Sequence, residues 1–557
     1  MVNKILSFLS KEISGLHQAA YLLGFFALLS QVLALVRDKL LAYYLGANIS
    51  LDLYYAAFRI PDFLFITIGS LVSISVIIPF FVEEEKKGEV FVRKFLDSVF
   101  SIFLLLIIAA SAVVYFLLPT ILSKIFPGFS AQSESLIGLS RILLLSPILL
   151  GISNLFGSLT QSRNRFFIYA LSPLLYNFGI ILGIIFLYPN FGLQGLTWGV
   201  VLGALLHMAI QLPSLIHLKL LPKLTFAPDF KKVRQLIILS LPRTITLSIN
   251  HIAIFFLLSL ASLMSVGSVS VFSLAFNLQS VPLSIIGVSY SLAAFPTLSR
   301  LFSSGEKEKF FSEILSSARH IIFWSVPVMV FFIVLRAHLV RVILGAGKFD
   351  WTDTRLTAAT LALFSISLVF QGLILLFVRG LYARGATGKP FYISIISGAT
   401  IVFSSYIFVY LFNHIDSFRY FIESLFKVAD LGGVEILMLA MGFTFGSILE
   451  GLLMWRQFAR QNPNMNVILL RTFFQVFSAS VIMGFVIYLA LRAFDLIFSL
   501  EKFSGVFLQG FLSGICGIAA WIIVLRLLKN GELQEIRKAI HARFWKAKAI
   551  SPDSQVV

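Results

Sequence analysis

Apolar runs long enough to cross a membrane recur along almost the whole chain. A spanning α-helix needs about 20 apolar residues. Of the 557 residues, 58% are hydrophobic and only 13% are charged. Inside a bilayer the backbone N–H and C=O groups must bond within the chain, so apolar runs of this length predict helices. The sequence therefore predicts an all-α polytopic membrane protein and argues against a soluble domain of this size.

Charged or Pro/Gly-containing breaks divide the apolar runs into about fourteen predicted transmembrane helices, with boundaries uncertain by about 2–4 residues. The predicted spans are 21–46, 50–82, 96–124, 134–161, 166–188, 192–217, 234–264, 267–299, 319–345, 354–384, 390–413, 431–455, 467–494 and 504–528. They suggest five parts, which are an interfacial N-terminal segment (1–20), a lobe of spans 1–6 (21–225), a lobe of spans 7–12 (226–460), spans 13–14 (461–530) and a basic tail (531–557).

The breaks between spans alternate in charge. Those after the second, fourth, sixth and eighth spans are rich in Lys and Arg, whereas 46–50, 188–192 and 264–267 carry neither. The positive-inside rule then places both termini in the cytoplasm. It also explains the net charge of +18 without a nucleic-acid partner. One cysteine, Cys516, excludes a disulfide within the chain, and the eight scattered His residues predict no metal site.

A faint internal repeat has an offset of 218 residues. Ala57-Phe58 matches Ala275-Phe276, Gly69 matches Gly287, and Ser73 matches Ser291. The second and eighth spans are then equivalent. Six spans, an even number, separate these two, so the copies would insert in the same direction. We therefore expect two parallel six-helix lobes around a central cavity, followed by two extra C-terminal helices.

Three spans carry polar side chains at helical spacing. Because a charged side chain at mid-membrane costs about 2.5–3.5 kcal/mol, such faces are expected to line a cavity rather than to face lipid. The candidates on the first, second and eighth spans are Arg37, Asp38, Asp52, Arg59, Asp62 and Asn277. One interpretation is structural, with Arg37 paired to Asp52 or Asp62 and Arg59 to Asp38. The other is that the guanidinium groups also bind an anionic headgroup, which Arg contacts in a bidentate manner.

Other polar residues have two interpretations each. Glu450, deep in the twelfth span, is a candidate for coupling transport to a cation, or it pairs with a neighbouring helix. Arg384 is a candidate gate residue, or simply a positive-inside charge. His251 is expected to be a hydrogen-bonded core residue. The sequence has no P-loop, G-x-S-x-G or H-E-x-x-H motif, so we expect a transporter and not an enzyme.

The stretches V-R-D-K-L-L-A-Y-Y-L-G-A and L-D-L-Y-Y-A-A-F-R-I-P-D resemble the opening of the MurJ/MviN family. This family comprises the lipid II flippases of the multidrug/oligosaccharidyl-lipid/polysaccharide exporter superfamily. Residues 267–288, 293–299, 345–350 and 380–390 extend the resemblance, which covers about 15–460. It implies an alternating-access carrier for undecaprenyl-linked peptidoglycan precursor in the bacterial inner membrane. It also implies a lipid-tail groove on spans 13–14 and cavity roles for Arg37, Asp38, Asp52 and Arg59.

The chain departs from the family pattern in its cavity charge. Gln31 and Asn277 stand where the family usually has Arg, and Phe65-Ile66 replaces an Arg pair. An acidic residue of the family is replaced by Ser70, and the seventh span lacks the sodium-ligating Asp of some relatives. Headgroup binding would then depend on Arg37 and Arg59, with Asn277 as a neutral donor.

The function expected from the resemblance is lipid II flipping, with no bound cofactor and with coupling to membrane potential, H⁺ or Na⁺ left open. The expected partners are a polyprenyl-diphosphate-linked substrate, membrane lipids and cell-wall synthesis proteins. Two alternatives are a flippase for another polyprenyl-linked oligosaccharide and a drug/cation antiporter of the same superfamily. A third, motivated by the missing arginines, is a transport-inactive membrane scaffold.

Overall fold

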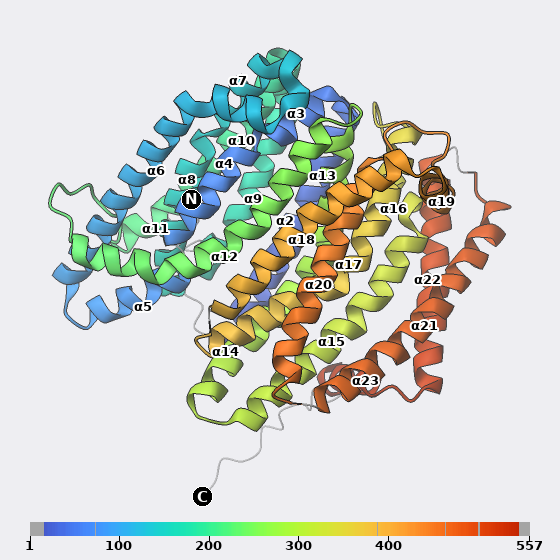
Figure 1. Ribbon diagram of the computed structural model, residues 1–557. Coiled ribbons are helices and arrows are strands. Elements are labelled where there is room, and N and C mark those ends of the chain that lie inside the picture. Colours follow the sequence, from blue (N-terminus) through green and yellow to red (C-terminus); the bar gives the residue numbers. More distant parts are fainter. Residues whose placement is uncertain (1–15, 73, 387, 463, 500–501, 545–557) are drawn as a thin grey trace, which may run out of the picture. The chain divides into compact units, whose positions relative to one another are not determined.

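The computed structural model describes residues 16–72, 74–386, 388–462, 464–499 and 502–544 (Figure 1). All regular elements in these ranges are helices, as the apolar runs predict. Within the residues that the structure describes, ten helical stretches are long and apolar enough to cross a membrane. Each predicted span overlaps a helix, and the count of fourteen stays a prediction.

The helices of the first part of the chain are α2 (Leu16–Leu45), α3 (Ile49–Ala57), α4 (Arg59–Leu64), α5 (Ile74–Glu85), α6 (Glu89–Ile125), α7 (Ser133–Leu143), α8 (Leu145–Ser162), α9 (Phe166–Leu182), α10 (Tyr188–Ala209), α11 (Leu212–His217) and α12 (Phe230–Ser262). The later helices are α13 (Ser268–Leu283), α14 (Ser289–Ser303), α15 (Lys307–Val334), α16 (Arg336–Ile343), α17 (Trp351–Ala383), α18 (Gly388–His414), α19 (Asp416–Phe426), α20 (Ile436–Ala459), α21 (Asn464–Asp495), α22 (Phe503–Leu527) and α23 (Gly531–Phe544).

The chain forms two compact units. The first comprises Met1–Val281, Val340–Phe364 and Gly385–Glu450, and the second comprises Pro282–Leu339, Ser365–Arg384 and Gly451–Val557. Four of the five boundaries between them fall inside α13, α16, α17 and α20, and the fifth follows the end of α17. The first unit thus combines the predicted first lobe with segments from the predicted second lobe. The lobe boundary near residue 225 stays a prediction.

In the first unit, α9 and the π-helical turn η4 (Gly183–Leu187) that follows it approach α10 along a seam of glycines. A Cβ atom built on Gly179 would lie 2.3 Å from the Cα atom of Gly203, and one on Gly199 would lie 2.5 Å from that of Gly183. These glycines recur at a spacing of four residues. The spacing places them on one helix face, as in small-xxx-small packing between membrane helices. Backbone contact replaces side-chain packing along this seam.

Aromatic side chains form a core where α13, α17 and α20 meet within the first unit. The ring of Phe276 packs against the rings of Phe272, Phe364 and Phe443, with centroid distances of 6.3, 5.6 and 5.4 Å. Phe272 and Phe364 are fully buried. The pair of Phe276 with Phe272 is stacked and the other two are edge-to-face. Aromatic pairs of these kinds add about 0.5–1.5 kcal/mol per pair to the burial of their area. This core supports the middle of α13, which carries Asn277.

The second unit contains α15, α21 and α22, with small residues at close contacts. Gly484 of α21 packs on Val330 of α15, and Gly517 of α22 packs on Ile487 of α21. The C-terminal helix α23 is attached to α15 and α21 by Glu532. This carboxylate accepts from Arg319 Nε at 2.7 Å and from Thr472 Oγ1 at 2.9 Å.

Single π-helical turns interrupt the second and eighth predicted spans at corresponding places. The turn η1 is Phe65–Gly69 and the turn η5 is Ser284–Val288. Their first residues are 219 apart, one residue from the offset of the sequence repeat. Such turns are rare and occur mostly as isolated bulges inside α-helices. Their matching positions support the equivalence of the two spans.

Candidate functional site

The Arg37 side chain of α2 is bound by two partners inside the first unit. Its Nε atom donates to Asp38 Oδ1 at 2.9 Å, and its Nη1 atom donates to Asn177 Oδ1 of α9 at 3.1 Å. Asn177 also donates to Ser30 Oγ at 3.3 Å. The guanidinium group is therefore held by the helices of the first predicted lobe and is only partly exposed.

Asp38 connects this group to α13. Its second oxygen, Oδ2, accepts from Asn277 Nδ2 at 3.1 Å. The carboxylate is 2% exposed, and a buried carboxylate is stable as an ion only when paired and hydrogen-bonded. Three predicted site residues, Arg37, Asp38 and Asn277, thus lie together. The expected ion pairs of Arg37 with Asp52 or Asp62, and of Arg59 with Asp38, were wrong. Arg37 instead binds Asp38, its own neighbour in sequence.

Asp52 of α3 caps the N-terminus of α13. Its oxygens accept from the backbone N–H groups of Gly267 and Ser270, both at 2.7 Å, and from Ser270 Oγ at 2.6 Å. The first N–H groups of a helix have no partner within the helix and carry partial positive charge, so a buried carboxylate is well placed here. Gly267 has φ of +93°, and a Cβ on it would lie 2.3 Å from the Ala47 carbonyl oxygen.

The segment G-A-G-K-F-D (345–350) and the first turn of α17 add hydrogen bonds at the same end of the first unit. Lys348 N donates to the carbonyl oxygen of Tyr43 at 3.0 Å, and Ala47 N donates to Asp353 Oδ2 at 3.0 Å. The end of α2 is therefore joined to the loop 345–350, and the loop between α2 and α3 is joined to the start of α17. All of these contacts connect segments of the two predicted lobes.

Arg59 and Asp62 form a second polar group close to the first. Asp62 is within electrostatic range of Arg59, and Tyr55 is within range of both Arg37 and Arg59. Arg59 Nε and the Tyr55 hydroxyl are buried without a hydrogen-bond partner among the residues described. Two buried donors left in this way mark a place where a polar ligand would be favourable.

His251 of α12 is an exposed side chain within electrostatic range of Arg59. The expectation that it would be a hydrogen-bonded core residue was therefore wrong. The error came from reading an isolated His in an apolar run as buried. A His in an apolar run can instead be exposed where its helix borders a polar cavity.

Among the described residues, Glu450 and Arg384 contact residues outside the Arg37 and Arg59 groups. Glu450, which is 4% exposed, accepts from Ser394 Oγ at 2.8 Å and from Ser397 Oγ at 3.1 Å, both on α18. Arg384 lies in the second unit, about 6 Å from the ring centroids of Phe302, Phe310 and Phe311. The hydrogen bonds of Glu450 do not join it to the Arg37 group.

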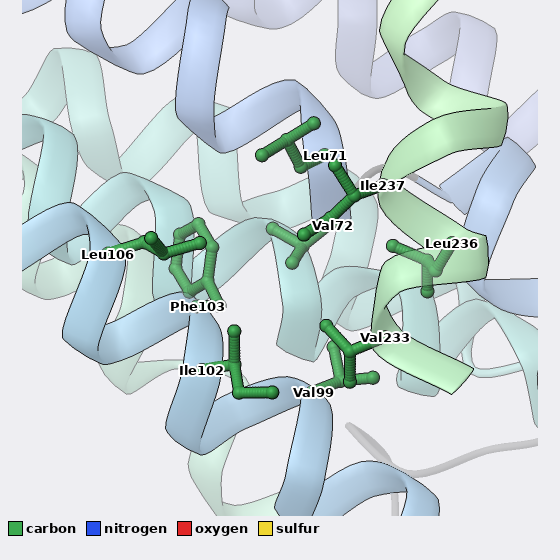
Figure 2. A pocket seen from close by; sticks show the side chains of 9 residues that line it. All are labelled: Leu71, Val72, Val99, Ile102, Phe103, Leu106, Val233, Leu236 and Ile237. Atoms are coloured by element: carbon green, nitrogen blue, oxygen red, sulfur yellow. The ribbon is translucent and has the colours of Figure 1, made fainter. Parts of the chain in front are cut away.

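An apolar pocket lies elsewhere in the first unit. Figure 2 shows its nine lining side chains, which belong to the turn η2 (Ser70–Val72), α6 and α12. They are Leu71, Val72, Val99, Ile102, Phe103, Leu106, Val233, Leu236 and Ile237. All are apolar, so this pocket offers nothing to a charged headgroup. No cluster of His, Cys, Asp and Glu in the described ranges could hold a metal ion.

Sequence reasoning missed Asn177 and Ser270. Asn177 is an isolated amide inside an apolar helix, which is a usable signal because such residues seldom face lipid. Its partner Arg37 is 140 residues away, so the pairing itself could not be read from spacing. Tyr55, on the polar face predicted for the second span, lies near the end of α3, and Arg59 begins α4 four residues later.

The comparisons with known proteins agree with this architecture. The family profile described as lipid II flippase MurJ matches residues 41–508. A probable lipid II flippase MurJ of Borreliella burgdorferi is 27% identical over 378 residues, covering 66% of this chain and 72% of that protein. A probable lipid II flippase MurJ of Thermotoga maritima is 24% identical over 527 residues, covering 94% and 98%.

Two solved structures share the fold. A lipid II flippase MurJ in an inward closed conformation has a TM-score of 0.74 at 24% identity, covering 93% of this chain and 100% of that one. An inward-facing multidrug resistance transporter of the MATE family has a TM-score of 0.63 at 16% identity, covering 78% and 95%. Since the family profile spans most of the sequence, the chain belongs to the MurJ family of lipid II flippases.

Proposed function

We propose that this protein moves undecaprenyl-linked peptidoglycan precursor, lipid II, across the bacterial cytoplasmic membrane by alternating access. The observation that carries the proposal is the set of contacts joining the two predicted lobes at one end of the first unit. Asp38 accepts from Asn277, and Asp52 accepts from Gly267 and Ser270. An alternating carrier needs a closure of this kind, which can open when the other side closes.

The loop charges assign this closed end to the outside. Residues 46–50 and 264–267 carry no Lys or Arg, and both flank the contacts of Asp52. By the positive-inside rule they face away from the cytoplasm, and both termini lie within it. In this proposal Asp38, Asp52 and Asn277 form the outer gate, and Arg384 belongs to the cytoplasmic side.

Headgroup binding is assigned to Arg59, with Tyr55 and His251 beside it. The unpartnered Arg59 Nε and Tyr55 hydroxyl can donate to phosphate oxygens without breaking an existing hydrogen bond. Arg37 differs, because Asp38 and Asn177 already bind it. A diphosphate that displaces Asp38 from Arg37 would also weaken the bond from Asn277, so binding would loosen the outer gate.

Coupling is assigned to Glu450. A carboxylate buried in a membrane helix, with two hydroxyl donors on one neighbouring helix, is most stable when it is protonated or when it binds a cation. H⁺ and Na⁺ are both compatible with this carboxylate. The membrane potential would then act on the cation that the site takes up.

The test is complementation of a strain whose own lipid II flippase can be depleted. The unmutated chain should restore growth, Arg59→Ala should abolish rescue, and Arg37→Ala should reduce it. Arg163→Gln is the matched control, because this arginine follows the end of α8 and its ion pair with Glu85, the last residue of α5, is partly exposed. Expression of every variant is checked in the membrane fraction.

The outcomes separate the alternatives. Well-expressed unmutated protein that does not rescue would favour another polyprenyl-linked substrate, a drug/cation antiporter or a scaffold for cell-wall synthesis proteins. Rescue that survives both Arg37→Ala and Arg59→Ala would overturn the headgroup assignment. Loss of rescue in Glu450→Gln, with the protein folded, is expected if the carboxylate carries the coupling cation.

A further inference from the structure

The linker between α11 and α12 is fixed along the side of α6. Three backbone N–H groups of the linker donate to α6 side chains: Lys223 N to Asp97 Oδ1 at 2.7 Å, Thr225 N to Ser101 Oγ at 2.8 Å, and Asp229 N to Ser98 Oγ at 2.9 Å. The three acceptors lie within one turn of α6. This segment therefore has a defined path, although it contains no helix of its own (Figure 1).

The fixed linker exposes its largest apolar side chains. Leu224 is 67% exposed, Phe226 is fully exposed, and Phe230, the first residue of α12, is 70% exposed. At the start of α6, Val90 and Phe91 are also exposed. Several large apolar side chains exposed on a segment whose backbone is held in place indicate a surface that is covered in use.

The charges around this surface indicate what covers it. Residues 219–234 contain five basic side chains and one acidic side chain, Asp229, a net charge of +4. Lys219, Lys223, Lys231 and Arg234 are exposed. The nearby Glu84 is buried and neutralised by Lys232 and Lys87, at 2.6 and 2.9 Å. Aromatic side chains surrounded by Lys and Arg are the composition that binds anionic lipid surfaces.

We propose that residues 219–230 form a membrane-surface strap that binds anionic phospholipids. Leu224, Phe226 and Phe230 enter the boundary between headgroups and acyl chains, and the lysines contact the phosphates. This surface is separate from the polar groups assigned to the substrate headgroup. The inference rests on the proposed function only for the side of the membrane, which the loop charges make cytoplasmic.

The strap also caps α12, the first helix of the second predicted lobe. Asp229 Oδ1 accepts from Lys232 N at 3.2 Å and so caps α12, while Lys232 Nζ is bonded to Glu84 at the end of α5. A lipid-bound strap would hold the start of α12 and the end of α5 at the bilayer surface. Anionic lipid should therefore stabilise the protein as well as bind it.

The test uses the full chain with its one cysteine replaced, Cys516→Ser. Phe226→Cys is labelled with the environment-sensitive fluorophore NBD and reconstituted in nanodiscs of phosphatidylcholine alone or with phosphatidylglycerol. Ser304→Cys, exposed in the polar turn between α14 and α15, is the control. We expect about twofold weaker quenching by acrylamide at position 226 than at 304, and a further decrease with phosphatidylglycerol. Lys223→Gln with Lys231→Gln should remove that further decrease.

Equal quenching at the two positions in both lipids would overturn the proposal. Disulfide-linked dimers of the Phe226→Cys variant, formed in nanodiscs that hold two copies, would overturn it in favour of self-association. If the weaker quenching at position 226 is the same with and without phosphatidylglycerol, the anionic-lipid assignment is overturned. Thermal unfolding gives a second measurement. The double variant Leu224→Ser, Phe226→Ser should have the same unfolding temperature as the unmutated protein in phosphatidylcholine. It should not show the rise in unfolding temperature that phosphatidylglycerol causes in the unmutated protein. None of these measurements requires transport, so they do not depend on the substrate.

Discussion

Asp52 and Ser270 are 218 residues apart in the sequence, and their side chains form a hydrogen bond of 2.6 Å. The same number is the offset of the internal repeat, so the two residues occupy equivalent positions in its two copies. Equivalent positions touch only close to the axis that relates the copies. In the proposed function, the pair therefore marks the point of the outer gate where the two copies meet. A change in the angle between the two copies would alter this hydrogen bond.

Asp52→Asn should weaken the outer gate. The amide keeps one acceptor oxygen but turns an NH₂ group toward backbone donors, so at least one of the three hydrogen bonds is lost, at about 1–3 kcal/mol. Ala34 lies one turn before Asp38 in α2. In the Cys516→Ser background, Ala34→Cys should therefore react faster with an impermeant maleimide added from outside. Ser270→Ala, which removes only one bond, should give a smaller increase. Unchanged labelling in both variants would contradict a gating role for Asp52.

Asn177→Leu should destabilise the Arg37 group. Arg37 loses the acceptor at 3.1 Å, and a buried donor without a partner costs about 1–3 kcal/mol. A lower unfolding temperature and weaker growth rescue are expected. Asn190→Leu is the control, because that exposed amide bonds only the backbone of its own helix region, at Phe186 O. If both variants lose the same stability, Asn177 is an ordinary helix residue.

Acid should destabilise the protein in part through Glu84, which lies beyond the predicted end of the second span. Burial alone would raise the pKa of Glu84, but its bonds to Lys232 and Lys87 outweigh burial and hold the pKa below its ordinary value of 4.5. A lowered folded-state pKa contributes stability that is complete above the ordinary pKa and is lost as the pH falls through the folded-state pKa. Glu84→Gln should therefore reduce stability at pH 7 and flatten its decline below about pH 5. Glu83→Gln, at an exposed neighbour, should change neither.

Gly199→Ala should disrupt the seam between α9 and α10. The added Cβ would lie 2.5 Å from Gly183 Cα, where only backbone can move aside, and overpacking of this kind costs about 1–3 kcal/mol. Gly138→Ala in α7 is the matched control, because nothing lies within 4 Å of its added Cβ. In the control, the better helix propensity of Ala should be neutral or stabilising. Thermal unfolding of the two variants measures the difference.

The helical class and the polar faces could be predicted because hydropathy and helical spacing are local properties of the chain. The polar faces gave Arg37, Asp38 and Asn277 as neighbours in one group, and the structure brings these three together. The partners within the group could not be predicted. Asp38 lies next to Arg37 in sequence, where helix geometry places successive side chains about 100° apart, yet a long Arg side chain can still turn back to its neighbour.

Asn177, Ser270 and the linker acceptors on α6 lie more than 100 residues from the groups they bind. Only the packing of the spans brings them together, and hydropathy does not specify that packing. The linker illustrates this limit. Its Lys content predicted a cytoplasmic loop, but the match between its N–H groups and Asp97, Ser98 and Ser101 depends on the exact course of α6.

The glycine seam has a mechanical consequence. Where backbone meets backbone, no side chain can change rotamer to absorb a shift, so α9 and α10 can separate only by losing their whole contact. The pair should therefore travel as one rigid strut through the transport cycle. Asn177 lies two residues before Gly179 on this strut and binds Arg37. The position of that guanidinium is thus tied to the strut, and any reorientation of α9 and α10 would carry the charge with it.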